Sequence, residues 1–288
     1  MAAVMPAPAA SRVLMSGNEA VARAVWEAGV KVAAAYPGTP STEMLEVIST
    51  YPDIYAEWSV NEKVSLEVAI GAAYAGSRAF CCMKHVGMNV ASDALMTLTL
   101  TGVVGGLVIA IADDVGLSSS QNEQDSRYWG RFAHVPLFEP ADSQEAYAMT
   151  LAAFELSEKY QVPVILRMTT RINHVKALVT VGERQEYVGA GFKKDPSRFV
   201  MVPGNAGKRD KVKQRIRIMR AMVLTEQLDL DDPEPDGVGA DVDRREPSHA
   251  RSSSEAAGRW LLSRASWRNG TVTVRSAPGA TREGWKNS

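Results

Sequence analysis

The sequence has very little cysteine and no excess of charge of either sign. Only two of its 288 residues are cysteines, and these two, Cys81 and Cys82, are adjacent. Adjacent cysteines form no ordinary disulfide framework, and no Cys-x-x-Cys pair is present to hold zinc or an iron–sulfur cluster. The formal net charge is −1, so no broad basic surface points to nucleic acid. These absences disfavour disulfide-rich, zinc-finger and nucleic-acid-binding proteins.

Long apolar runs and targeting signals are also missing. The best apolar run, Gly105–Ala112, has the length of a strand, whereas a membrane helix needs about 20 residues. Met1–Ala10 is rich in alanine and proline but lacks the basic start and apolar centre of a secretory signal. We therefore expect a cytoplasmic protein with neither a membrane nor a nucleic acid as its partner.

Three widespread ligand-binding motifs are absent as well. No Gly-x-Gly-x-x-Gly follows the first predicted strand, which disfavours a dinucleotide site. No Gly-x-x-x-x-Gly-Lys-Ser/Thr loop is present for a nucleoside triphosphate, and no Gly-x-Ser-x-Gly elbow for a hydrolase.

What the sequence does contain, up to Gly182, is a regular alternation of apolar runs and amphipathic stretches. This order predicts an α/β fold with an open, mostly parallel, doubly wound sheet and helices on both faces. The predicted strands are 31–35, 54–60, 79–84, 106–112, 135–138 and 163–167, and the predicted helices are 17–28, 42–49, 62–75, 88–101 and 143–160.

Ligands of such sheets bind beyond the carboxyl ends of the strands, so the loops that follow the strands are the candidate sites. The first is Tyr36-Pro37-Gly38-Thr39-Pro40-Ser41. Two prolines make it rigid, Gly38 allows close backbone approach, and Thr39 offers a hydroxyl in front of a helix that Ser41 can cap. This setting suits an anionic group. The plain alternative is a tight strand-to-helix turn.

The next two strand ends carry ionisable side chains. Asn61 can cap a helix that begins with Glu62 and turns Val64, Val68, Ala72 and Ala75 inward. Glu62 is either functional or an acid that favours the helix dipole. Lys84 and His85 end the third strand, where they can serve electrostatics or proton transfer, or be structural.

A long polar loop, Asp113–Arg127, follows the fourth strand. A loop of this length inside a compact domain is usually functional. Asp113 and Asp114 suit magnesium, but no third spaced ligand accompanies them.

The pattern changes near Thr225. Residues 1–225 hold 10 Lys and 13 Arg, whereas residues 226–288 hold 1 Lys and 8 Arg, and three of the six tryptophans fall in this tail without apolar periodicity. We expect the tail to be disordered or the product of a frameshift. Residues 183–225 form a linker whose basic helix, Lys208–Ala221, has a nucleic-acid patch as its minor alternative. Residues 1–11 are expected to be disordered, which leaves 12–182 as the folded domain.

Taken together, the loops resemble the alpha subunit of indolepyruvate:ferredoxin oxidoreductase, continuously from about Arg12 to Val181. The resemblance is carried by YPGTPS at 36–41, EWSVNEK at 57–63, MKHVGMNVA at 83–91, SSQNEQD at 119–125, EPADSQEA at 139–146 and PVILR at 163–167. It implies the pyrimidine-binding domain of a thiamine-diphosphate enzyme. The tyrosine–proline turn is shared with wider 2-oxoacid:ferredoxin oxidoreductases, so pyruvate and 2-oxoglutarate stay open as substrates.

The resemblance implies that an aryl 2-oxoacid, coenzyme A and oxidised ferredoxin become acyl-CoA, carbon dioxide and reduced ferredoxin. Glu62 would hydrogen-bond the aminopyrimidine ring as the catalytic glutamate. The remaining residues would line the two ligands: Tyr36, Pro37, Gly38 and Asn89 the cofactor, and Thr39, Arg127, Lys84 and His85 the substrate.

The family's full chain continues into a half that holds diphosphate and Mg²⁺, then into a cysteine-rich domain with iron–sulfur clusters. Neither continuation is recognisable after Thr225, so we expect this polypeptide to supply half of the cofactor site and no metal ligand. It would be inactive alone, and would need the beta subunit and ferredoxin as partners in a homo- or hetero-oligomer. The alternative is a non-catalytic, truncated pyrimidine-domain protein.

Overall fold

The computed structural model describes residues 11–212 and 273–275. Its main sheet has the strand order β3-β2-β4-β5-β7-β6-β9, and every ladder in it is parallel. The mostly parallel α/β fold is therefore confirmed. The strands before the tail are β2 (Val32–Ala35), β3 (Tyr55–Trp58), β4 (Ala79–Lys84), β5 (Leu107–Asp113), β6 (Leu137–Glu139) and β7 (Val164–Thr169).

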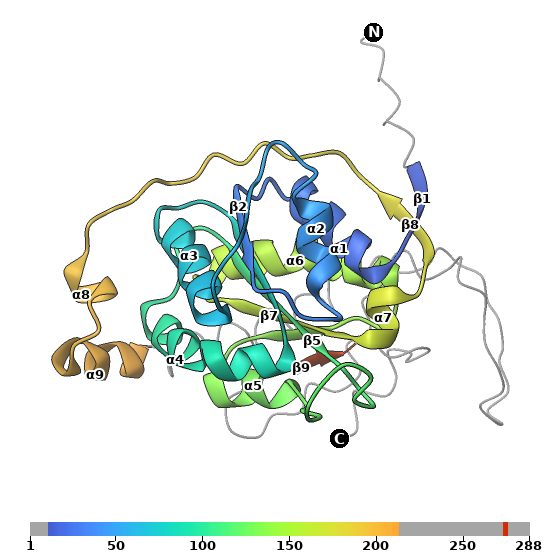
Figure 1. Cartoon of the computed structure of the whole chain (residues 1–288). Helices are drawn as coiled ribbons and strands as arrows, with labels where there is room; N and C mark the ends of the chain where they lie inside the picture. The colour runs from blue at the N-terminus through green and yellow to red at the C-terminus, as the bar shows by residue number, and fades with distance from the viewer. Residues whose placement is uncertain (1–10, 213–272, 276–288) are drawn as a thin grey trace, which may run out of the picture.

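Helices cover both faces of this sheet (Figure 1). One apolar core lies between the sheet and α1 (Gly17–Glu27), α2 (Thr42–Ile48) and α6 (Ser143–Tyr160). The other core lies on the opposite face, under α3 (Glu62–Tyr74), α4 (His85–Thr101) and α5 (Arg127–Ala133).

The central strands explain this two-sided packing. All six residues of β4 and all seven of β5 are buried. Because successive side chains of a strand point to opposite faces, Phe80 and Cys82 join the first core, while Cys81 and Met83 join the second. A continuous apolar run is thus the sequence mark of a strand covered on both faces.

Side-chain caps fix where several helices begin. Asn61 accepts a hydrogen bond from the Val64 amide at 2.9 Å, as predicted. The predicted Ser41 cap is wrong, because the Ser41 hydroxyl donates back to the Gly38 carbonyl at 2.7 Å instead.

The predicted inward face of α3 is also wrong. Val64, Val68 and Ala72 are half-buried and Ala75 is exposed, and the buried positions are Ser65, Leu66, Ala69, Ile70 and Ala73.

A second, two-stranded sheet was not predicted. β1 (Ser11–Met15) pairs antiparallel with β8 (Ala177–Val181), which follows α7 (Thr170–His174). Val179 and Val181 pack on α1 and α6. Ser11 therefore begins a strand, although residues 1–11 were expected to be disordered.

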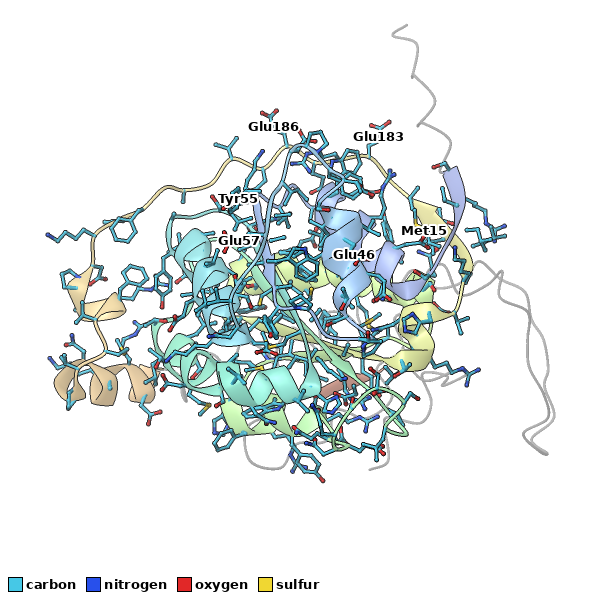
Figure 2. The ribbon with its side chains drawn as sticks, in the orientation of Figure 1. Met15, Glu46, Tyr55, Glu57, Glu183 and Glu186 are labelled. Carbon is cyan, nitrogen blue, oxygen red and sulfur yellow. The ribbon has the colours of Figure 1, made fainter. Side chains whose placement is uncertain are left out.

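After β8 the chain crosses the molecule as an extended segment and reaches α8 (Pro196–Phe199) and α9 (Pro203–Val212) (Figure 1). The Gln185 amide donates to Glu27 O at 2.7 Å, and Tyr187 donates to Gly76 O at 3.2 Å. These contacts lie before β2 and β4, so the segment runs along the amino-terminal edge of the sheet. Figure 2 shows Glu183 and Glu186 on it, pointing outward.

Apart from Thr273–Arg275, the predicted disordered tail, 226–288, lies outside the described residues, as does most of the predicted basic helix, 208–221. Within the tail, Thr273–Arg275 forms β9, which pairs in parallel with β6. None of the described helices is both long and apolar enough to cross a membrane.

Candidate functional site

The loops after β2 and β5 converge on the junction between β4 and α4, which follow each other without a loop. A Cβ atom added at Gly38 would lie 3.2 Å from Cβ of Lys84, so the β2 loop passes close to that side chain. Lys84 is buried, and its ammonium donates to Ser119 O and lies 4.0 Å from Oδ2 of Asp114. The structure thus brings together three of the strand ends that the sequence singled out.

Glu62 is the first residue of α3, and its side chain reaches the same junction. A Cβ atom added at Gly87, in the first turn of α4, would lie 2.6 Å from both Cγ and Oε1 of Glu62. The Glu62 side chain is half-buried, and its carboxylate has no hydrogen-bond or ion-pair partner within residues 11–212. Burial raises the pKa of the Cys81 thiol to about 12, with its hydrogen bond to Ser65 opposing the shift and the Glu62 charge adding to it.

His85 is fully buried and holds the long loop after β5. Its Nδ1 accepts the amide hydrogen of Asp114 at 3.2 Å, so the ring proton belongs on Nε2. That nitrogen lies 2.9 Å from the carbonyl oxygen of Asn122, to which it donates. Both ring nitrogens are therefore engaged with backbone, which gives His85 a structural role whether or not a substrate is bound.

Ion pairs between arginine and carboxylate side chains fix the far end of the loop after β5. Asp113 is fully buried and accepts from the Ser126 amide at 3.0 Å and from Nε of Arg167 at 2.7 Å. Arg127 donates to both carboxylate oxygens of Glu139, at 2.7 and 2.6 Å. Arg167 also reaches Glu139, at 2.7 Å. The guanidinium of Arg127 is thus occupied by carboxylates, and its substrate role stays a prediction.

Thr39 is exposed at the tip of the β2 loop, while Pro40 beside it is buried. The Thr39–Pro40 peptide bond is cis. The Gly38 amide donates to Oγ1 of Thr42 at 2.9 Å, and Pro40 O accepts from Asn18 and Asn173. The other predicted cofactor residues, Tyr36, Pro37 and Asn89, are exposed.

Three buried residues of this region were not singled out from the sequence: Asn18, Asn173 and Arg167. Arg167 interrupts the apolar run of β7, and a charged residue within a buried strand is the signal that could have found it. No comparable local signal marks the two asparagines. Within the described residues, no group of three or more His, Cys, Asp or Glu is placed to hold a metal ion.

Residues 23–219 match the family model described as "Pyruvate flavodoxin/ferredoxin oxidoreductase, thiamine diP-bdg". The chain belongs to this family. It is 50% identical over 207 residues to the indolepyruvate oxidoreductase subunit IorA of Methanothermobacter marburgensis, a match that covers 70% of the chain and 34% of that subunit. It is 27% identical over 180 residues to the 2-oxoglutarate synthase subunit KorA of Methanothermobacter thermautotrophicus, covering 59% of the chain and 48% of that subunit.

A solved structure shares the fold of this family member. The 2-oxoglutarate:ferredoxin oxidoreductase from Magnetococcus marinus superposes with a TM-score of 0.55 at 21% identity, over 63% of this chain and 33% of that one. The chain thus spans about a third of the length of the IorA subunit that it matches. Thiamine diphosphate is the cofactor that the family description names.

Proposed function

We propose that this chain supplies the pyrimidine-binding part of an indolepyruvate:ferredoxin oxidoreductase alpha subunit. The observation that carries the proposal is the 50% identity to an indolepyruvate oxidoreductase subunit, against 27% to a 2-oxoglutarate synthase subunit. An enzyme of this class would convert a 2-oxoacid and coenzyme A into an acyl-CoA and carbon dioxide and pass electrons to ferredoxin.

The environment of Glu62 fits thiamine diphosphate. Its carboxylate is half-buried, carries no partner among the described residues and lies against a glycine that leaves room for it. A carboxylate in that position can accept a hydrogen bond from a ring nitrogen, and partial burial strengthens such a bond. When bound, the cofactor supplies the carbon nucleophile. Glu62 would hydrogen-bond the aminopyrimidine ring of the cofactor and so assist proton transfer on that ring.

Substrate binding is assigned to the β2 loop. Thr39 is exposed at its tip, and its hydroxyl has no partner among the described residues, so it is free to donate to the carboxylate of a 2-oxoacid. Lys84 is the second proposed substrate contact, because its aliphatic stem lies close to Gly38, while its ammonium is held by Ser119 O and by the charge of Asp114. Tyr36, Pro37 and Asn89 are the residues that we propose for the cofactor's rim.

Mg²⁺, the diphosphate and the iron–sulfur clusters belong, in this proposal, to segments beyond the described residues or to other subunits. A beta subunit and ferredoxin are the proposed partners. Alone, the chain is expected to reduce no ferredoxin.

A chimera tests the proposal. Residues 12–181 replace the matching segment of the Methanothermobacter marburgensis subunit, which is then assembled with the other subunits of its enzyme. We expect 2-oxoacid-dependent dye or ferredoxin reduction with indolepyruvate preferred over pyruvate and 2-oxoglutarate. A folded chimera that is inactive with all three would contradict the proposal, and a preference for 2-oxoglutarate would reassign the substrate.

A further inference from the structure

Two buried asparagines from distant parts of the chain donate to one carbonyl oxygen. Nδ2 of Asn18, in the first turn of α1, lies 2.9 Å from Pro40 O, and Nδ2 of Asn173, in α7, lies 2.7 Å from the same atom. Asn18 is 1% exposed and Asn173 is 0% exposed. One backbone atom of the β2 loop is therefore held from two independent elements.

Close packing of α1 on α7 makes this convergence possible. A Cβ atom added at Gly17 would lie only 2.2 Å from Ile172 O, so the two backbones approach too closely for any other residue at position 17. The next residue on each side of this contact is an asparagine, Asn18 after Gly17 and Asn173 after Ile172. The glycine thus brings both amides within reach of Pro40.

Stability alone gives no account of this pair. Oδ1 of Asn18 and Oδ1 of Asn173 are both buried without a hydrogen-bond partner among the described residues. A buried amide that leaves its oxygen unpaired carries a desolvation cost. Asn18 gains one further bond, to Oε2 of Glu43 at 3.0 Å, whereas the Asn173 side chain has Pro40 O as its single hydrogen-bond partner within the described residues.

The carbonyl they hold belongs to the residue after Thr39. Gly38 and Ser41 are tied within the loop, since the Ser41 amide donates to Gly38 O at 2.8 Å. Thr39 itself is exposed, with its hydroxyl unengaged by the described residues. The anchoring of Pro40 O therefore fixes the backbone next to Thr39.

We propose that Asn18 and Asn173 are positioning residues that hold the β2 loop so that Thr39 presents its hydroxyl to the carboxylate of a 2-oxoacid. This inference rests on the proposed function for its substrate. It rests on the geometry alone for the holding of the loop.

The two donors allow a clean variant. Asn173→Leu keeps the approximate side-chain shape and removes one donor, while Asn18 still satisfies Pro40 O, so the fold is retained. Asn18→Leu is the reciprocal variant. Thr150→Val is the matched control, because Thr150 is also fully buried and donates to a backbone carbonyl, that of Ala146 at 2.6 Å, within α6.

The first measurement uses NMR of the full chain. We expect Asn173→Leu to shift the Thr39 amide and methyl signals and to speed amide exchange in the loop, whereas Thr150→Val leaves these signals in place. Unchanged Thr39 signals in both asparagine variants would overturn the positioning role.

The second measurement uses the chimera described above. We expect Asn173→Leu to raise KM for indolepyruvate about tenfold, the change that loss of one buried hydrogen bond produces. The kcat of this variant should change little. Thr150→Val should leave both KM and kcat unchanged. An unchanged KM in a variant whose loop signals have moved would overturn the link to the substrate. If the unsubstituted chimera turns over no 2-oxoacid, the proposed function fails, and the NMR experiment still decides whether the amides hold the loop.

Discussion

Glu62 lies so close to Gly87 that no side chain can be accommodated at position 87 without moving one of them. The Cβ of an alanine there would fall 2.6 Å from Oε1 and 2.8 Å from Cδ of Glu62. Glu62 starts α3 and Gly87 lies in the first turn of α4. The carboxylate position is therefore set jointly by two helices that follow β3 and β4, the strands on either side of β2.

Gly87→Ala should displace the Glu62 carboxylate. Alanine within a helix normally stabilises by about 1 kcal/mol relative to glycine, so a loss of stability would report the clash. Gly71→Ala is the control, because Gly71 lies inside α3 and a Cβ there meets nothing within 4 Å. We expect Gly71→Ala to raise the melting temperature, and Gly87→Ala to lower it together with activity of the chimera. Equal stabilisation by both would contradict the proposed contact.

Glu62→Gln should lower turnover in the chimera by about 10²–10⁴-fold, the range for loss of general acid–base assistance. Glutamine keeps the shape but loses the charge. The unfolding free energy should fall by only about 0.3–1 kcal/mol, the value of a helix-start acid. Glu67→Gln, an exposed position on the same helix, should leave both quantities nearly unchanged. Full activity of Glu62→Gln would remove this residue from the mechanism.

Local sequence patterns predicted several of the elements that build the domain and its site. β4 at 79–84 and α6 at 143–160 were placed to the residue, and the Asn61 cap that fixes the start of α3 was predicted correctly. These features depend on apolar runs and cap chemistry within a few residues. The inward face of α3 was misassigned because that helix carries small apolar residues around much of its circumference, so no single stripe stands out.

Features that join distant segments were not predictable in this way. The ribbon of β1 and β8 pairs Ser11 with Val181 across the whole domain. The convergence of Asn18 and Asn173 on Pro40, and of Arg167 on Asp113, depends on the packed fold. A short stretch of sequence contains no information on which distant residues a buried polar side chain will bind.

Arg167→Met should destabilise the domain strongly. Arg167 is 4% exposed and pairs with Asp113, which is 0% exposed, so its loss leaves a buried carboxylate without its cation. Breaking one side of a buried ion pair costs about 3–5 kcal/mol. Urea unfolding at pH 7 measures the change, with exposed Arg171→Met as the control. We expect Asp113→Asn combined with Arg167→Met to recover part of the loss, and a double variant no better than the single one would contradict the pairing.

Asp114→Asn should weaken the dependence of the unfolding free energy on pH at acid pH. Burial would raise the pKa of Asp114, but hydrogen bonds from Ser120, Ser119 and Thr170 and the charge of Lys84 outweigh it and hold that pKa below its usual value. The Ser119 amide donates to Oδ2 at 2.7 Å, so the ionised carboxylate organises the start of the loop.

The sign of the effect follows from the lowered pKa in the folded state. A depressed carboxyl pKa contributes stability that is fully present above the unfolded-state value of about 3.9 and is lost as the pH falls through the lower folded-state value. Asp114→Asn should therefore be less stable than the unsubstituted chain in urea at pH 7, with the same deficit at pH 5. Below about pH 4 the deficit should shrink, because the unsubstituted chain then loses the contribution as well. A deficit that widens with acidification would mean that Asp114 is ionised at a cost in the folded state, and would contradict its place as the carboxylate around which Ser119 and Ser120 fold the loop.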